Sequence, residues 1–496
     1  MPGRLSRRRI GLAGVLVGGA VLWIAGLVWF RPWIAHNDFA IFRIALEREL
    51  DGHIRVVGAH SRLGVFHPGP LREWVFALPY WFSGRRSASL PATALVLNAG
   101  WVVWTLAVLA RLRHRHRPWG VAGVFGLALV VVALGADIGS PWNPHLAIVP
   151  AYLACWSLVT VIVRDGQGWV ACLCSASFAA QLHASMLIVG GAVLVAALVT
   201  IASRRDARMT AYAVGVALLL WSGPIIDLRR GADANLVRLG TVGADGDPVG
   251  WIGAVGHVSR LLWPGTPWQR ISVRPSITEF TALSPVWLLT VVIFLGAAVM
   301  VGRYVRQNAP DVEPGDAPGG PEPDAMAPVA GLVALGGLTL TVVSVSLFVE
   351  PVYRYLYGPL QGVAVFSLAV AIGGAVTVTQ TLAGDGLRRP SGSMVSVAAV
   401  AATGVAVLVI SIVFVSVPRR DGPSVERSEL GVEGAVTAAL ERRPGWRTIE
   451  AVPLDLIGAG DLDAEVLDVA LRRGVDARSR RVELGLDAPD QVDGVF

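Results

Sequence analysis

The chain contains no lysine and carries few charges of any kind. All 42 of its basic residues are arginine, and charged residues make up 16% of its 496 positions. A soluble globular enzyme has a charged fraction near about 25%, so this composition excludes that class. Disorder requires low hydrophobicity, whereas 54% of these residues are hydrophobic. Because lysine is absent, a Schiff base and a P-loop lysine are excluded, and arginine must bind any phosphate.

Cysteine is also scarce. The three cysteines, Cys155, Cys172 and Cys174, all lie in apolar runs, which argues against a disulfide framework and against a zinc site. An isoelectric point near 9.7 is a feature of nucleic-acid-binding proteins. Here the arginines scatter between hydrophobic runs, so we predict no nucleic-acid partner. The composition instead predicts a polytopic membrane protein.

Long apolar runs occupy most of the sequence. A run of about 20 apolar residues crosses the hydrocarbon core of a bilayer as a helix. The first run, at 10–30, is followed by aromatic residues and by no cleavage site, so we predict a retained span. The predicted spans are 10–30, 90–110, 119–135, 146–163, two within 168–202 that turn near 181–183, 210–226, 286–301, 329–349, 358–382 and 394–417. The predicted fold class is therefore an all-α membrane bundle of eleven transmembrane helices.

Arginine is distributed unequally between the short loops. One side of the predicted bundle holds nearly all of these arginines, and the other side holds only Arg354. Because arginine-rich short loops stay inside, we predict a plasma-membrane protein with a cytoplasmic amino terminus and an external carboxyl terminus. Residues 1–417 form the transmembrane domain, with outer loops 31–89 and 227–285 and a flexible inner loop 307–328. Residues 418–496 form a small external α/β appendage.

The first outer loop contains two short amphipathic segments. Apolar residues recur at helical spacing after Asp38, which opens the first segment. The motif 67–71, His-Pro-Gly-Pro-Leu, opens the second segment, with Pro70 at its first helical position. The second segment reaches only about 20 Å as a helix, too short to span. We therefore predict two helices lying in the outer interface.

Several polar residues have both a structural and a functional interpretation. Asp38 suits a helix N-cap or a base that deprotonates an acceptor hydroxyl. Arg354 suits bidentate phosphate binding or an interfacial arginine that reaches lipid headgroups. Asp137 suits a solvated turn or a second functional carboxylate. Gln181 and His183 lie within apolar sequence, which favours a cavity lining over a buried helix contact.

The order of elements is one span, two in-plane helices and a second span. This order resembles that of the GT-C superfamily of polyprenyl-phosphate-sugar-dependent glycosyltransferases. Protein O-mannosyltransferases and lipid A aminoarabinose transferases belong to that superfamily. Asp38 and the motif 67–71 stand where those enzymes carry an acidic residue and a His-Pro-Pro-Leu-like motif. Residues 354–359 resemble the Arg-Tyr-Leu-x-Pro segment of a late span. The segments 140–145, 181–183 and 221–227 resemble an uncharacterised actinobacterial membrane-protein group.

The chain also departs from the family pattern. Phe39 follows Asp38 where the family often has Asp-Glu, and Gln181 and His183 stand where many members have a lysine. These departures leave the divalent-metal requirement and the phosphate contacts open. The abundance of arginine, alanine, glycine and valine is typical of a high-GC bacterium such as an actinomycete. Mannose and arabinose are the sugars that the resemblance suggests.

The resemblance implies transfer of a sugar from a polyprenyl-phosphate donor to an envelope glycan or lipid acceptor at the outer face. It implies these roles: Asp38 as catalytic base, Asp137 binding acceptor or metal, Arg354 and His67 holding the donor phosphate, and Gln181, His183, His145 and Asn143 lining the cavity. A flippase or exporter would instead need ionisable residues along a path from inside to outside, and the inner halves of these spans have almost none. A non-catalytic envelope assembly protein would leave Asp38, Asp137 and Arg354 apart.

Overall fold

The structure is a computed structural model that describes most of the region between residues 38 and 382. The described residues are 38–61, 65–115, 117–163, 168–241, 248–263, 279–307, 326–349, 352–382, 448–451 and 476–479, with 19, 22, 24–30, 33 and 35 near the amino terminus. The predicted last span, 394–417, and most of the predicted first span, inner loop and appendage lie outside these residues.

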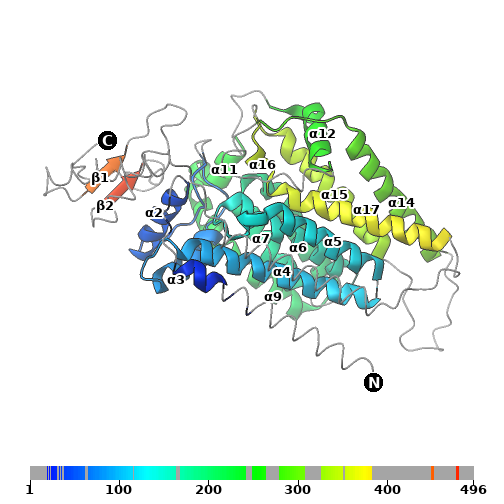
Figure 1. The fold of residues 1–496 in the computed structure, drawn as a ribbon, viewed down its shortest axis with the longest axis horizontal. Helices are drawn as coiled ribbons and strands as arrows, with labels where there is room; N and C mark the ends of the chain where they lie inside the picture. Colours follow the sequence, from blue (N-terminus) through cyan, green and yellow to red (C-terminus); the bar gives the residue numbers. More distant parts are fainter. Residues whose placement is uncertain are drawn as a thin grey trace, which may run out of the picture.

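The described chain is a bundle of α-helices (Figure 1). The helices are α2 (Asp38–Leu50), α3 (Leu71–Phe82), α4 (Ser89–Arg115), α5 (Arg117–Leu134), α6 (Asn143–Ile162), α7 (Gly168–Leu182), α8 (Leu187–Ser203), α9 (Ala207–Leu220), α10 (Ser222–Asp227), α11 (Asn235–Leu239), α12 (Gly250–Leu261), α14 (Val286–Gln307), α15 (Met326–Ser346), α16 (Arg354–Tyr357) and α17 (Leu360–Leu382). Short 3₁₀ segments join some of them: η1 (Gly135–Gly139), η2 (Ala184–Met186) and η3 (Leu228–Asp233). In the carboxyl-terminal region two described strands, β1 (Thr448–Ala451) and β2 (Asp476–Ser479), pair in parallel.

The predicted membrane architecture agrees with these helices. Five described helices are long and apolar enough to cross a membrane, or six if the bent pair α9 and α10 forms one span. Three shorter apolar helices, at 118–134, 168–182 and 286–300, cover further predicted spans. Each predicted span between residues 90 and 382 thus corresponds to a described helix or to that bent pair, and the chain is an integral membrane protein.

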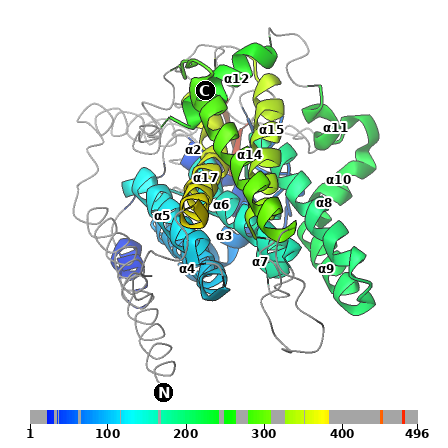
Figure 2. The same ribbon diagram turned by 90° about the vertical axis from the view of Figure 1, so that its right-hand side faces the viewer.

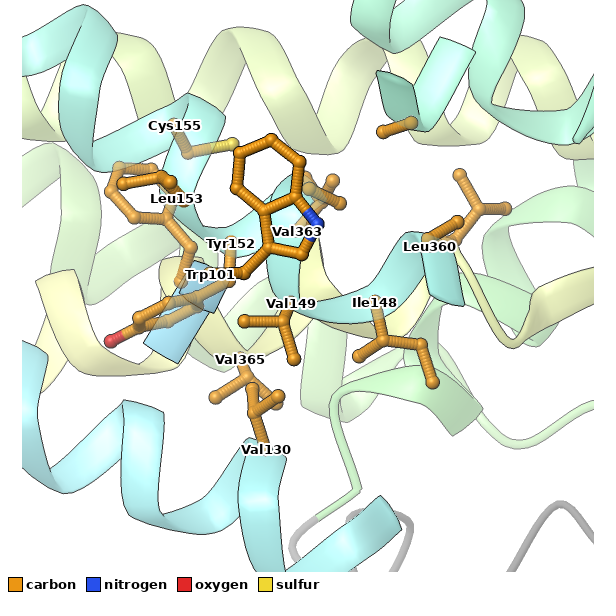
Figure 3. Close-up of a cluster of buried hydrophobic side chains, with 14 of the residues drawn as sticks. Trp101, Val130, Ile148, Val149, Tyr152, Leu153, Cys155, Leu360, Val363 and Val365 are labelled. Carbon is orange, nitrogen blue, oxygen red and sulfur yellow. The ribbon is translucent and has the colours of Figure 1, made fainter. Parts of the chain in front are cut away.

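The helix α6 is the centre of the bundle. Nearly all of its length is buried against α4, α5, α7, α8, α15 and α17. Its side chains Ile148, Val149 and Tyr152 pack against Val363 and other residues of α17 (Figure 3). Close approach here depends on Gly362, because a Cβ at that position would overlap the carbonyl oxygen of Ile148. This packing fixes the start of α6 with respect to α16 and α17.

The predicted span at 210–226 is not one continuous helix. The structure breaks this segment at Trp221, where α9 and α10 meet at an angle of 66°. Gly223 and Pro224 follow the break, and proline and glycine weaken helical continuation. Figure 2 shows α8, α9 and α10 together on one flank of the bundle. Pro70 also differs from the prediction, because it precedes α3 as its N-cap residue.

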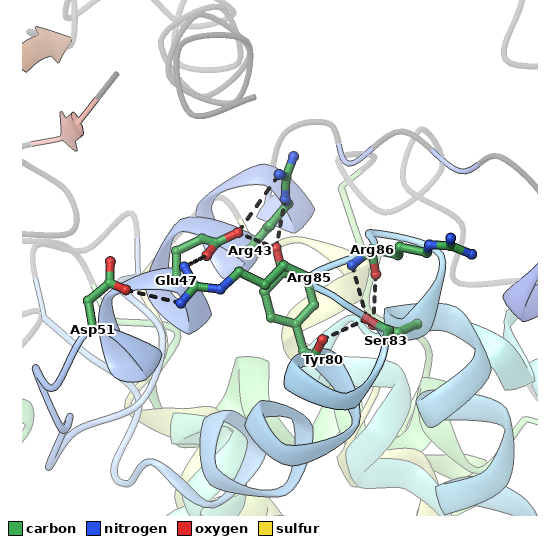
Figure 4. Close-up of polar contacts among 8 residues, drawn as sticks. Arg43, Glu47, Asp51, Tyr80, Ser83, Arg85 and Arg86 are labelled. Carbon is green, nitrogen blue, oxygen red and sulfur yellow. Dashed lines mark hydrogen bonds and ion pairs between the residues drawn. The ribbon is translucent and has the colours of Figure 1, made fainter. Parts of the chain in front are cut away.

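Both predicted in-plane helices are present at one end of the long helices (Figure 1). α3 exposes Leu78, Trp81 and Phe82. Its opposite face packs on α2 through a polar network (Figure 4). Tyr80 donates a hydrogen bond to the carboxylate of Glu47 at 2.5 Å. Arg85 forms an ion pair with the same carboxylate at 2.7 Å. This network fixes α2, and therefore its first residue Asp38, on α3.

Candidate functional site

Asp38 and Trp142 are joined by a hydrogen bond between two distant parts of the chain. The indole Nε1 of Trp142 donates to Oδ2 of Asp38 at 2.8 Å. Asp38 is exposed in the first turn of α2, whereas Trp142 is buried just before α6. Phe39 and Ala40 pack on the same indole. The contact orients the carboxylate of Asp38 and leaves its other oxygen, Oδ1, available to a ligand.

Arg354 opens α16, which lies beside the same tryptophan. The ring of Tyr355 lies 5.8 Å from the ring of Trp142, centroid to centroid. The Arg354 side chain is partly exposed, and its Nε has no hydrogen-bond partner among the described residues. A carboxylate from the start of α2 and an arginine-bearing helix from the late part of the chain therefore meet at Trp142.

The described parts of the segment 227–285, the predicted second outer loop, hold α16 in place. Backbone N–H groups of this loop donate to the segment before α16, from Val249 to Phe348 and from Phe280 to Val352, each at 2.8 Å. The ring of His257, on α12, stacks 5.4 Å from the ring of Tyr357. These contacts give the loop a supporting role in the site. Trp251 of the same loop is exposed.

Asp137 lies in η1, in the connection that leads to Trp142. Its carbonyl accepts the N–H of Ser140 at 2.9 Å, and the side chain of Asn98 donates to the Ile138 carbonyl at 2.7 Å. This turn is therefore well anchored. Among the described residues, no hydrogen bond or ion pair joins the Asp137 carboxylate to Asp38 or Arg354. Asp137 is thus close to Trp142 along the chain, but within the described ranges its carboxylate is not bonded to either group.

A second polar cluster begins at the residue after Trp142. The side chain of Asn143 donates to the Leu182 carbonyl at 3.1 Å, which ties the start of α6 to the end of α7. The next residue, His183, stacks on His67 with ring centroids 4.9 Å apart. The ring of His145 lies edge-on to the ring of Trp142, with ring centroids 4.9 Å apart. Four of the predicted site residues, Asn143, His145, His67 and His183, are thus linked around α6.

Gln181 explains the glycine in the motif 67–71. The N–H of Gly69 donates to the Gln181 carbonyl at 3.3 Å, and a Cβ at Gly69 would overlap the Gln181 side chain. The Gln181 amide in turn donates to the Leu220 carbonyl at 2.8 Å. Gln181 is fully buried, and these bonds join the motif, α7 and α9.

Asn235 is a site-supporting residue whose role the sequence does not predict. Its side-chain oxygen accepts the N–H of Phe66 at 2.8 Å, and its amide donates to the Phe66 carbonyl at 2.9 Å. Asp227 holds the Asn235 backbone through a 2.6 Å hydrogen bond. These bonds position the residue just before His67. No local pattern identifies such a contact, because the two partners lie 169 positions apart.

Several charged residues of α2 and α3 are buried or partly buried. Arg72 pairs with Glu73 at 2.7 Å, and its guanidinium lies 3.8 Å from the centre of the Phe42 ring. Burial, reinforced by the neighbouring Glu73, raises the pKa of Glu49 from 4.5 to about 8. Burial also lowers the pKa of His67 well below its ordinary value, so this imidazole is neutral at pH 7.

The sequence does not decide whether the protein needs a divalent metal ion. Within the described ranges, no group of three or more His, Cys, Asp or Glu side chains gathers in a way that could hold a metal ion. The three cysteines are free thiols. The charged groups at the site itself are the carboxylate of Asp38 and the guanidinium of Arg354.

The fold and these contacts define a helical membrane protein with a polar site assembled at one end of its bundle. No protein-family model matches the chain. No curated protein matches it either. Among solved structures, the chain is similar to ArnT from Cupriavidus metallidurans bound to undecaprenyl phosphate, with 12% identity and a TM-score of 0.45 over 93% of this chain and 89% of that chain.

The same protein in the apo state gives 15% identity and a TM-score of 0.37 over 92% of this chain and 88% of that chain. These are distant likenesses. The functional assignment of this chain rests on its own residues.

Proposed function

We propose that the chain is an integral membrane glycosyltransferase of the GT-C type. It transfers a sugar from a polyprenyl-phosphate donor to an envelope glycan or lipid acceptor at the outer face of the membrane. The observation that carries the proposal is the meeting of Asp38 and the Arg354 helix at Trp142. Sugar transfer from a lipid phosphate needs a base for the acceptor and positive charge for the departing phosphate. The two sides of this contact supply these groups.

Each group has a defined part in the proposed reaction. Asp38 takes the proton of the acceptor hydroxyl as the hydroxyl oxygen forms its bond to the sugar. The bond between the sugar and the phosphate oxygen breaks, and the electron pair leaves with the phosphate. Arg354 and His67 stabilise the charge on the leaving phosphate through N–H donors. Asp137 binds the acceptor, or a divalent cation if the reaction needs one.

The remaining predicted residues shape the site. In this proposal His145 and Asn143 line it from the start of α6, and His183 and Gln181 line it from the end of α7. The alternative of a non-catalytic assembly protein gives no reason for Asp38 to meet α16. The alternative of a flippase or exporter gives no reason for the polar clusters to gather at one end of the bundle.

The test is transfer of labelled sugar by the purified protein in lipid nanodiscs. The donors are polyprenyl-phosphate mannose and polyprenyl-phosphate arabinose, and an envelope extract supplies the acceptor. We expect Asp38→Asn to lower the rate by about 100-fold or more, because the base is lost while the side-chain size is kept.

The matched control is Asp206→Asn. Asp206 caps α9 through a hydrogen bond from the N–H of Met209 at 2.9 Å, and asparagine caps helices equally well. This variant should transfer at the wild-type rate. Equal rates for the wild type and Asp38→Asn would reject Asp38 as the base.

A further inference from the structure

The stacked imidazoles of His67 and His183 share one unusual environment. Their Nδ1 atoms face two successive backbone N–H groups. Ala184 N–H donates to Nδ1 of His67, and Ser185 N–H donates to Nδ1 of His183, each at 3.3 Å. The hydroxyl of Ser185 also lies 2.8 Å from Nδ1 of His183. The rings are 9% and 3% exposed, respectively, so water has little access to them.

These contacts decide where the protons are. A backbone N–H can only donate, so both Nδ1 atoms must accept and both Nε2 atoms carry the proton. The lowered pKa of His67 agrees with a neutral ring. Because adjacent residues of one turn occupy both Nδ1 atoms, both Nε2–H groups remain to donate elsewhere, and the stacking of the two rings keeps them close together. Among the described residues, the hydrogen bonds of these two rings all involve Nδ1, so both Nε2–H donors are available to a ligand.

The turn that contacts the two rings is the start of a long helix. η2 leads directly into α8, and the first N–H groups of a helix carry partial positive charge. Each ring accepts such an N–H and is polarised by it, so its Nε2–H becomes a stronger donor. Positively polarised N–H donors favour an oxyanion. A metal ion would need a free lone pair on the ligating nitrogen, and in this arrangement both Nε2 lone pairs are replaced by protons.

We propose that His67 and His183 together form a two-donor oxyanion site, which binds a phosphate oxygen of the lipid-linked donor. The proposal rests on the proposed function and extends it from Arg354 and His67 to a neutral pair that includes His183. The pair is connected to the proposed base through neighbouring residues, because Asn143 bonds to Leu182, the residue before His183, and Trp142, the residue before Asn143, bonds to Asp38. A neutral pair adds hydrogen bonds to the phosphate without a second buried cation.

Equilibrium binding tests this proposal without turnover. The probes are undecaprenyl phosphate and undecaprenol, which share one tail and differ in the phosphate, added to the full chain in dodecyl maltoside micelles. His183→Phe keeps a stacked ring and removes the donor. We expect this variant to bind undecaprenyl phosphate about tenfold or more weakly and undecaprenol as the wild type does. His183→Gln retains an acceptor and an N–H donor, and should recover most of the affinity.

The control is His60→Phe, the same replacement at a third histidine in the first outer loop, outside the pair. It should bind both probes as the wild type does. Unchanged binding of undecaprenyl phosphate by His183→Phe would overturn the proposal, as would an equal loss for both lipids. Equal affinity of the wild type for phosphatidylglycerol would also overturn it, because the site would then be a general headgroup site.

A spectroscopic measurement guards against a variant that fails to fold. In ¹⁵N-histidine spectra of the wild type, protonated and unprotonated ring nitrogens resonate in separate ranges. We expect both histidines of the pair to carry the proton on Nε2, and these Nε2 resonances to shift when undecaprenyl phosphate is added. Protons on Nδ1 of both rings would refute the donor pair. The proposed transferase reaction would still stand or fall on Asp38→Asn.

Discussion

Replacing Trp142 by phenylalanine removes one hydrogen bond at the centre of the site and little else. The indole Nε1–H donates to Asp38 at 2.8 Å, and phenylalanine has no such donor. The aromatic contacts survive, because a phenyl ring at this position still meets Tyr355 and His145. The variant therefore separates orientation of Asp38, the proposed base, from packing of the bundle.

The size of the effect follows from the bond that is lost. A hydrogen bond to a charged group contributes about 1.5–3 kcal/mol, which corresponds to about tenfold to 150-fold in rate. Asp38 is exposed, so water replaces part of the lost interaction. We therefore expect the lower end of this range, a loss of about tenfold in kcat, with little change in the unfolding temperature.

The assay compares initial transfer rates in nanodiscs with thermal unfolding of each variant. Trp74→Phe is the matched control, because its indole also donates a hydrogen bond, at 3.1 Å, but to the carbonyl of Arg55. Trp74→Phe should keep the wild-type rate. If Trp142→Phe also keeps it, the indole does not orient the base. If Trp142→Phe lowers the unfolding temperature markedly together with the rate, the loss of rate comes from altered packing.

Three further predictions concern charge and topology. Arg354→Lys keeps the positive charge but loses the planar fork, so transfer should fall about tenfold if the residue grips phosphate and stay unchanged if it only reaches headgroups. The pKa of Glu49 is about 8 in the folded protein, against an ordinary value of 4.5. Between these two pH values the folded state keeps a proton that the unfolded state loses, so the stability of the folded protein falls as the pH rises from 4.5 to about 8. Glu49→Gln should flatten that dependence in thermal unfolding at a series of pH values, and an unchanged slope would assign it to other groups. Reporters active on only one side of the membrane should place 418–496 outside and 307–328 inside, and matching signals from both would reject the eleven-span topology.

Much of the helical framework can be predicted from the sequence, because apolar length alone identifies a span. The turn near 181–183 is a good example. Gln181 and His183 are polar residues inside a long apolar run, and the structure breaks the run between Leu182 and η2. The bend at Trp221 is not predicted, although Gly223 and Pro224 follow it, because the surrounding apolar residues also fit one continuous helix.

The site is less predictable than the helices. The sequence indicates Asp38, His67 and Arg354 as polar residues beside spans, but not which of them meet. In the sequence Trp142 stands out only as part of the segment 140–145, and its bond to Asp38 depends on how the start of α2 meets the segment before α6. Asn235 is a similar case, since its partner Phe66 is remote in sequence. Contacts of this kind arise from tertiary packing, which local periodicity does not encode.

The order of the site residues along the chain has a consequence for biosynthesis. Asp38 and Trp142 leave the ribosome early, the partner of Phe66 follows 169 positions after it, and α16 comes only after α15. Contacts between remote residues form late, because the intervening chain must first be ordered. A chain released before residue 354 has its first helices and the carboxylate of Asp38 but lacks α16 and its arginine. In the proposed function, an incomplete copy in the membrane is therefore inert, and transfer begins only once the late helices are inserted.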